Sequence, residues 1–511
     1  MSFLDKEQII AQPGYSRWLV PPAALFVHLC IGQVYAFSVF KLPMTQLLGI
    51  QESAPGDWTF TQLAWIFSLA IVLLGLSAAV FGRWVERAGP RKAMFTAACC
   101  FGGGLVISSF GVSAHQLWLI YLGYGVLGGC GLGIGYISPV STLIKWFPDR
   151  PGMATGMAIM GFGGGAMIAS PLSVLLMDFF ASRTSMGVAP TFLTLGIIYF
   201  ISMCIGAAIV RVPPADWKPA GFTAPTKSQK LITAAHVHVN EAMKTPQFYF
   251  LWGVLFLNVT AGIGILEQAS PMSQEMLRGA ISAGAAAGFV GLLSIFNMLG
   301  RFCWASLSDY IGRKNTYTVF FILGMGLYTL IPWAASIGSV ALFVLCCCVI
   351  ISMYGGGFAT IPAYLRDIFG TMHVGAIHGR LLTAWSAAGI VGPVLVNYMR
   401  EYQIHSHVAK ANAYNLTMYI MAGLLACGLL CNLMMRPVSR KHHYQEAEDD
   451  ARQGRGPAAR AEVAAMNKHD THSDIAEHRT SPALIALAWA AVLIPLGWGF
   501  ISTLLEASQL F

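Results

Sequence analysis

Twelve long apolar runs, followed by a thirteenth after a polar gap, limit what this chain can fold into. A helix needs about 20 mostly apolar residues to cross the hydrocarbon core of a membrane, and each run reaches that length. Only 11% of the 511 residues are charged, as expected of a protein embedded in a lipid bilayer. The sequence therefore predicts an all-α membrane protein. The predicted spans are 18–40, 60–82, 93–112, 116–140, 153–180, 190–211, 247–268, 281–305, 316–337, 339–362, 380–399, 413–435 and 483–505.

Basic residues in the short loops predict the orientation of the chain. They gather after the second, fourth, eighth and tenth runs, where Arg91, Lys145, Arg313 and Arg366 are examples. Cytoplasmic loops carry such an excess, so we expect a bacterial inner-membrane protein with a cytoplasmic N-terminus. The formal net charge of +8 then reflects topology, and we expect no nucleic-acid partner.

The first 436 residues contain an internal repeat, which indicates two related halves. Segment 82–92, GRWVERAGPRK, matches segment 305–314, ASLSDYIGRK, at an offset of 222 to 223 residues. The stretches 137–139, ISP, and 360–362, TIP, keep the same offset. Two repeated six-helix bundles are typical of transporters whose substrate site lies between the halves.

Composition divides the chain into five predicted parts. The tail is polar and should be mostly disordered; its scattered histidines fit surface positions better than a metal site, so we expect neither metal nor cofactor. The last apolar run is long enough to cross the membrane. The alternative is that it lies against the bundle, because Pro495 and Gly497 interrupt it. The parts are an N-terminal six-helix bundle at 1–211, a cytoplasmic linker at 212–246, a C-terminal six-helix bundle at 247–436, a polar tail at 437–482 and an additional apolar helix at 483–505.

Arg301 is the most informative single residue of the sequence. If Asp309 marks the membrane edge, a helical rise of ~1.5 Å per residue places Arg301 roughly 12 Å inside the bilayer. A charge at that depth is costly, so the side chain should face protein or a water-filled cavity. A planar guanidinium fits a carboxylate, which predicts a small organic anion as substrate. The alternative is that Arg301 reaches the membrane edge or pairs with Asp309.

Other candidate site residues lie on the spans expected to face the same cavity. Asn297 lies at i−4 from Arg301, on the same helix face, where it either assists binding or makes a helix–helix hydrogen bond. Phenol and indole groups would cage a short organic tail, although each also fits ordinary packing. His28, near the middle of the first span, is a candidate for proton coupling, with a packing role as the alternative. The aromatic candidates are Tyr35, Tyr124, Tyr354 and Trp385.

The two repeated charged segments resemble the motif found between the second and third helices of each half in the major facilitator superfamily. Three stretches are also similar to the oxalate/formate antiporter group and its monocarboxylate transporter relatives: GQVYAFSVF (32–40), NMLGRFCWASLSD (297–309) and YGGGFATIPAYLRDIFG (354–370). The resemblance implies the major facilitator fold, with Asn297 and Arg301 as the N-x-x-x-R context of the carboxylate-binding arginine. Oxalate-carrying members have a lysine where Trp385 stands here, which argues against an oxalate-type pair of cations.

The charged segments are expected to act as a gate. Acidic and basic residues at helix ends can pair across helices when one side of a transporter is closed and separate when it opens. The matching position of Arg301 in the first half is Ala78, so the arginine stands outside this repeat. The predicted gate residues are Glu86, Arg91, Lys92, Asp309, Arg313 and Lys314.

We therefore expect a secondary active transporter of small monocarboxylates of the formate, acetate, lactate or pyruvate class. Transport would proceed by alternating access and be coupled to protons; an oxalate/formate-type exchange against a counter-anion is the alternative. The chain contains no GxxxxGK[ST] motif, so ATP is not expected to drive it directly. No arrangement of catalytic residues favours an enzyme, and a sensor is a more distant alternative. The sequence does not specify an oligomeric state.

Overall fold

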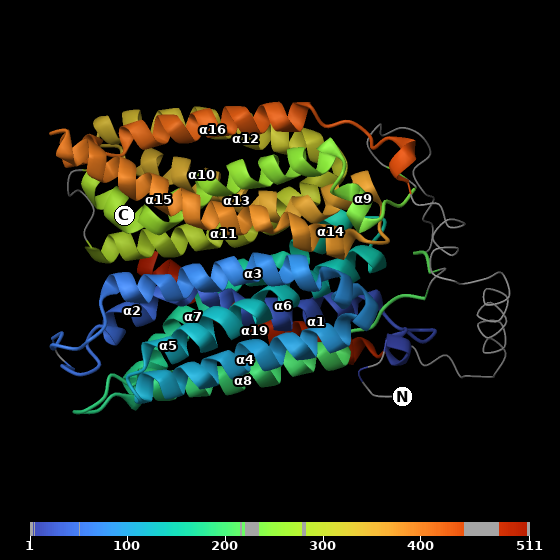
Figure 1. The fold of residues 1–511 in the computed structure, drawn as a ribbon, viewed down its shortest axis with the longest axis horizontal. Helices are drawn as coiled ribbons and strands as arrows, with labels where there is room; N and C mark the ends of the chain where they lie inside the picture. Colours follow the sequence, from blue (N-terminus) through green and yellow to red (C-terminus); the bar gives the residue numbers. More distant parts are fainter. Residues whose placement is uncertain are drawn as a thin grey trace.

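The regular structure of the chain is helical, as predicted. The computed structural model describes residues 4, 6–50, 52–214, 217–219, 233, 235–277, 283–443 and 480–507. Within these ranges, thirteen helices are long and apolar enough to cross a membrane. Twelve of them form two bundles that lie one against the other, and the thirteenth packs beside them (Figure 1). The predicted fold class is thereby confirmed.

The first bundle contains eight helical segments that make six spans. Thr59 caps α3 through a reciprocal hydrogen-bond pair with Gln62, and proline begins both α4 and α7, where its missing N–H costs nothing. Two spans predicted as continuous are interrupted, by a 3-10 turn at Gly32–Ala36 and a π-helical stretch at Tyr121–Gly128. The segments are α1 (Val20–Ile31), α2 (Ser38–Met44), α3 (Phe60–Ala88), α4 (Pro90–Ser113), α5 (Leu117–Ile120), α6 (Gly129–Trp146), α7 (Pro151–Phe180) and α8 (Val188–Ile209).

The second bundle follows the short helix α9 (Val239–Ala242). The span predicted at 380–399 is longer than expected, because the chain is already helical from Val374, breaks at Leu382 and continues to His405. That extension brings the start of α14 into the contact with the first bundle. The segments are α10 (Pro246–Met276), α11 (Ala283–Ile311), α12 (Arg313–Ser336), α13 (Val340–Phe369), α14 (Val374–Leu381), α15 (Thr383–His405) and α16 (Asn415–Leu433).

The last helix, α19 (Pro482–Ala507), is long enough to span and also packs against the bundles. It contacts α1 and α7 of the first bundle and α11 of the second, so it lies across the boundary between them. Val492 and Leu496 are buried there against Leu25, Met167 and Met298. The predicted polar tail, 437–482, lies mostly outside the described residues, which resume at 480.

Glycines let helices of the first bundle approach closely. A methyl group at Gly165 of α7 would lie 2.4 Å from the Leu29 carbonyl oxygen and 2.8 Å from the Gly32 Cα atom. Both are backbone atoms of the first span, which cannot rotate away. The glycine run in α7 therefore sets the distance between α7 and α1, and with it the position of the aromatic residues on both.

Replacing Gly165 by Ala should destabilise the purified protein by about 1–3 kcal/mol, because the added methyl group overpacks a contact made by backbone atoms. Gly103→Ala is the matched control, since a methyl group there meets nothing within 4 Å. Thermal unfolding in detergent should give a lower Tm for Gly165→Ala and an unchanged Tm for the control. Equal Tm values for both variants would contradict the close-contact interpretation.

Candidate functional site

Arg301 of α11 lies fully buried at the boundary between the two bundles. Its Nε donates to Asn297 Oδ1 at 3.0 Å, and its Nη1 donates to the carbonyl of Ile159, on α7 of the other bundle, at 3.4 Å. Its Nη2 has no hydrogen-bond partner among the described residues. Asp309, offered above as an alternative partner, bonds elsewhere. The site therefore holds a buried positive charge whose donors are only partly used.

Aromatic rings from both bundles surround the guanidinium. Its Cζ lies 5.7 Å from the ring centre of Phe162 and 5.4 Å from that of Phe358. Trp385 packs against both of these rings, at 5.4 Å and 4.5 Å between ring centres. Aromatic faces carry partial negative charge, so they stabilise the cation without neutralising it.

Two tyrosines from opposite bundles meet beside this cage. The hydroxyl oxygens of Tyr35 and Tyr354 lie 3.5 Å apart, and the Tyr35 ring packs edge-on against Phe162 at 5.1 Å. Five predicted site residues are thus brought together: Arg301, Asn297, Tyr35, Tyr354 and Trp385.

Glycines provide the space for this arrangement. A methyl group at Gly355 would lie 2.6 Å from Asn297 Oδ1 and 3.1 Å from Arg301 Cγ. One at Gly163 would lie 3.4 Å from Arg301 Nε. The runs GGG at 355–357 and GGG at 163–165 thus let the helix backbones approach the arginine and its amide partner.

Tyr124 lies apart from the group around Arg301. Its hydroxyl donates to Gln33 Oε1 at 3.0 Å, and its ring packs against Phe37 at 4.7 Å. These contacts are all inside the first bundle. The structure thus brings this predicted binding residue into a packing role there, with its donor already used.

His28 is fully buried next to Tyr136. Its Nε2 lies 3.3 Å from the Tyr136 carbonyl oxygen, which only accepts, so Nε2 carries the hydrogen. Its Nδ1 then presents a lone pair and has no partner within the described ranges. The ring therefore has one nitrogen able to take up a proton.

Two side chains near the cage were not predicted as site residues, Tyr136 of α6 and His378 of α14. The Tyr136 ring lies 5.6 Å from that of Phe162, 5.6 Å from that of Trp385 and 5.8 Å from that of His378. The repeat offset contained a signal for Tyr136, because its counterpart 223 residues later is Ala359. The same asymmetry distinguishes Arg301 from Ala78.

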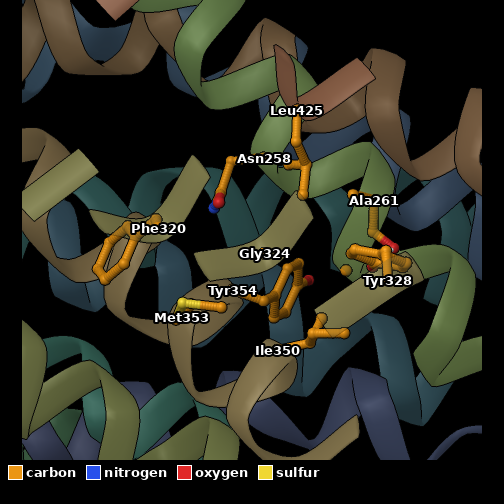
Figure 2. Close-up of a pocket in the computed structure, with 10 residues that line it drawn as sticks. Asn258, Ala261, Phe320, Gly324, Tyr328, Ile350, Met353, Tyr354 and Leu425 are labelled. Atoms are coloured by element: carbon orange, nitrogen blue, oxygen red, sulfur yellow. The ribbon is translucent and has the colours of Figure 1, made fainter. Parts of the chain in front are cut away.

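A small cavity lies inside the second bundle, and Tyr354 forms part of its wall (Figure 2). Its volume is about 10 Å³, roughly the space that one water molecule needs. Asn258 and Tyr328 supply polar groups at its wall, and the Tyr328 hydroxyl donates to the Ala261 carbonyl. The cavity is too small for a carboxylate.

At the end of the molecule that holds the charged loops, two carboxylates cross between the bundles. Asp309 of α11 accepts hydrogen bonds from the backbone N–H groups of Gly152 and Met153, at the start of α7, both at 2.9 Å. Glu86 of α3 accepts from Gly375 and Ala376, at the start of α14, at 3.0 and 3.2 Å. A helix N-terminus carries partial positive charge, so each carboxylate is placed where it stabilises the helix it caps.

The two contacts are copies of each other. The offset is 309 − 86 = 223 for the carboxylates and 375 − 152 = 223 for the first capped residues. Each half therefore caps one helix of the other half, and these reciprocal caps hold the charged ends of the two bundles together.

The basic gate residues have different partners. Arg313 pairs with Asp309 and lies 3.4 Å from an oxygen of Asp367, which supports the Asp309 cap. Arg91 donates to the carbonyls of Ala207 and Ala208, and Lys314 donates to those of Leu433 and Met435, each within its own bundle. Lys92 is exposed. In both reciprocal caps the carboxylate thus binds a helix N-terminus of the other bundle, and Glu86 also lies 3.3 Å from His373 Nδ1.

The sequence model of the Major Facilitator Superfamily matches residues 24–393, which is more than half of the chain. Among solved structures, the fucose transporter FucP in an outward conformation matches with a TM-score of 0.58 at 14% identity. The match covers 81% of this chain and 99% of that one. At this identity the likeness concerns the fold alone.

Several relatives are named as transporters of small organic anions. The oxalate:formate antiporter of Oxalobacter formigenes is 28% identical over 385 residues, covering 74% of this chain and 83% of the relative. The apicoplast pyruvate carrier 1 of Toxoplasma gondii is 23% identical, covering 82% and 89%. Human monocarboxylate transporter 10 is also 23% identical, covering 81% and 77%. The resemblance drawn from the sequence motifs is thereby confirmed.

Replacing Asp309 by Asn should loosen the start of α7 more than the start of α14. The amide keeps an acceptor oxygen but loses the charge that strengthens these bonds, so protection of the Gly152 and Met153 amides should fall about fivefold. Glu86→Gln should give the reverse pattern, with the larger loss at the start of α14. Hydrogen exchange followed by mass spectrometry measures both helix starts in each variant. Identical patterns in the two variants would contradict the reciprocal caps.

Proposed function

The chain belongs to the Major Facilitator Superfamily, and we propose that it is a secondary active transporter that moves small monocarboxylates across the membrane by alternating access. One observation carries the proposal: Arg301 is a buried, incompletely paired cation between the two bundles. A bound carboxylate would satisfy Nη2 and neutralise the charge. Binding of an anion thus offsets the unfavourable free energy of a buried, incompletely paired charge.

The charge of the cage supports a substrate with one carboxylate. Arg301 is surrounded by neutral aromatic rings, and Trp385 contributes an indole where oxalate carriers of this group are expected to have a lysine. A single cation balances a single negative charge, whereas a dianion would bury an unpaired charge. Formate, acetate, lactate and pyruvate are all monoanions.

Alternating access follows from the way both bundles share the site. Arg301 bonds to Asn297 on its own helix and to the Ile159 carbonyl of the other bundle, and the Tyr35 and Tyr354 hydroxyls meet across the same boundary. If the bundles rock apart at either end, the cage opens toward that side. The reciprocal caps of Asp309 and Glu86 would then act as the gate at the charged end.

We place the charged end in the cytoplasm, because basic residues gather in its loops. The N-terminal segment lies at the same end, where Arg17 forms a salt bridge of 2.8 Å with Asp149. This orientation puts the N-terminus inside the cell and the reciprocal caps at the cytoplasmic gate of a bacterial inner-membrane transporter.

Proton coupling is assigned to His28 in this proposal. Its Nδ1, which has no partner among the described residues, belongs to a ring that contacts Tyr136, and the Tyr136 ring packs against Phe162 of the Arg301 cage. An anion bound to Arg301 would favour a positive charge on the imidazole nearby. Substrate and proton would therefore bind more tightly together than separately, which is the requirement for symport.

An oxalate/formate-type exchange is the second candidate function. It is favoured by the 28% identity to the oxalate:formate antiporter of Oxalobacter formigenes over most of both chains. In that case the site at Arg301 would reorient to the other side of the membrane only with a counter-anion bound. A pH gradient would then not drive net uptake. Position 385 holds a tryptophan and not a second cation. We therefore consider exchange of a dianion less favoured than monocarboxylate transport.

Arg301→Met should reduce uptake of labelled formate, acetate, lactate and pyruvate into proteoliposomes by about 100-fold or more, since truncating one partner of a buried charge pair costs several kcal/mol. The Tm without substrate should not fall, because the arginine is incompletely paired in the empty site. Arg400→Met is the control: it breaks an ion pair with Glu275 inside the second bundle and should keep uptake. Undiminished uptake by Arg301→Met would overturn the binding assignment.

His28→Gln should uncouple uptake from the proton gradient. The amide can still donate to the Tyr136 carbonyl but cannot take up a proton. Acidifying the outside of liposomes should accelerate uptake by the parent protein severalfold and leave the variant unaffected. If the parent ignores the gradient and instead requires an internal anion, exchange replaces symport as the function.

A further inference from the structure

Three buried polar atoms near the cage lack partners and are not explained by carboxylate binding at Arg301. They are the Tyr136 hydroxyl, His378 Nε2 and Trp385 Nε1, none of which has a hydrogen-bond partner among the described residues. Their side chains are 0%, 1% and 0% exposed. Buried polar groups are nearly always hydrogen-bonded, so three neighbouring exceptions point to a missing partner.

These three rings form one cluster. Tyr136 is common to it, with its ring centre 5.8 Å from that of His378 and 5.6 Å from that of Trp385. Phe162 lies against both Tyr136 and Trp385, at 5.6 and 5.4 Å, and against the Arg301 guanidinium at 5.7 Å. The cluster therefore adjoins the carboxylate-binding group and shares Trp385 with it.

The chemistry of the three atoms defines the partner they need. An indole N–H only donates, and a phenol hydroxyl and a neutral imidazole can each donate one hydrogen. The Arg301 guanidinium, which lies against Phe162 next to Tyr136, disfavours a cationic partner. An oxygen with free lone pairs can accept from all three groups, and it should be uncharged because the carboxylate already balances the charge of Arg301.

We propose that Tyr136, His378 and Trp385 form a second, uncharged subsite that binds an oxo or hydroxyl oxygen on the organic part of the substrate. The inference rests on the proposed function, since Arg301 must hold the carboxylate for its substituent to reach the cluster. Formate and acetate carry no such oxygen. The subsite would make the transporter prefer carboxylates with an oxygen on the neighbouring carbon.

Both bundles contribute to this subsite. Tyr136 comes from α6 of the first bundle, whereas His378 and Trp385 come from α14 and α15 of the second. The three rings lie together only while the bundles are in contact at this level. A substrate that supplies the acceptor oxygen therefore stabilises the closed cage more than a substrate that lacks it. The preference for the oxygen-bearing substrate should be large, because a substrate without that oxygen leaves the buried donors of the subsite unpaired.

The test compares pyruvate and lactate with propionate, which has the same carbon chain and no second oxygen function. The full-length protein in liposomes should transport the two oxygen-bearing acids with a kcat/KM at least about tenfold above that for propionate. Tyr136→Phe removes one hydroxyl and keeps the ring packing, so it should lower that ratio about tenfold.

Tyr328→Phe is the matched control, because that buried hydroxyl already donates to the Ala261 carbonyl. The ratio should stay as in the parent. Trp385→Phe provides a second subsite variant if Tyr136→Phe does not fold, and it should lower the ratio in the same direction.

The two hypotheses fail in different ways. If the parent does not prefer the oxygen-bearing acids, or if Tyr136→Phe and Trp385→Phe keep the parental ratio while Arg301→Met abolishes transport of all three acids, the subsite is wrong and the carboxylate site stands. If Arg301→Met transports all three as well as the parent does, the proposed function is wrong as well.

Discussion

A positive charge held inside a membrane protein between two bundles is the interaction on which this structure depends. Arg301 is fully buried; it donates to Asn297 and to the Ile159 carbonyl, and its Nη2 has no partner among the described residues. Such a charge is tolerated only where protein groups replace water. The aromatic cage provides such groups around Arg301. The glycine runs let α7 and α13 approach α11, which brings further groups close to the arginine. They also leave the guanidinium short of a full set of partners, so that a carboxylate has a reason to bind.

The internal repeat supplies the mechanical frame around this asymmetric centre. Asp309 and Glu86 cap helices of the opposite bundle through contacts related by one offset, which is what a two-fold arrangement of repeated halves requires. Arg301 and Tyr136 have Ala78 and Ala359 as counterparts, so chemistry is concentrated where the repeat is broken. Helix α19 lies outside the repeat and crosses the same boundary against Met167 and Met298, which makes it part of the surface along which the bundles would move.

Much of this architecture follows from the sequence, because membrane spans are set by local composition. The spans and the i−4 relation of Asn297 to Arg301 depend on residues near each other along the chain, and they were predicted. The break at Leu382 and the π-helical stretch at Tyr121–Gly128 depend on packing between distant helices, and they were not. Tyr124 was grouped with the site from its helix alone; its hydroxyl is used by Gln33, a partner 91 residues away. Tyr136 was missed because its neighbours Trp385 and His378 come from the other half.

The central claim is that the Arg301 guanidinium binds the carboxylate directly. Solid-state NMR of the protein in lipid, with ¹⁵N in arginine side chains and ¹³C in the carboxylate of the bound acid, measures that contact as a dipolar distance. A bidentate pair should place the carboxylate carbon about 4 Å from the guanidinium nitrogens. The signal should disappear in Arg301→Lys, whose side chain keeps the charge but carries no arginine label. A bound acid with no such coupling, or a coupling that persists in Arg301→Lys, would contradict the account.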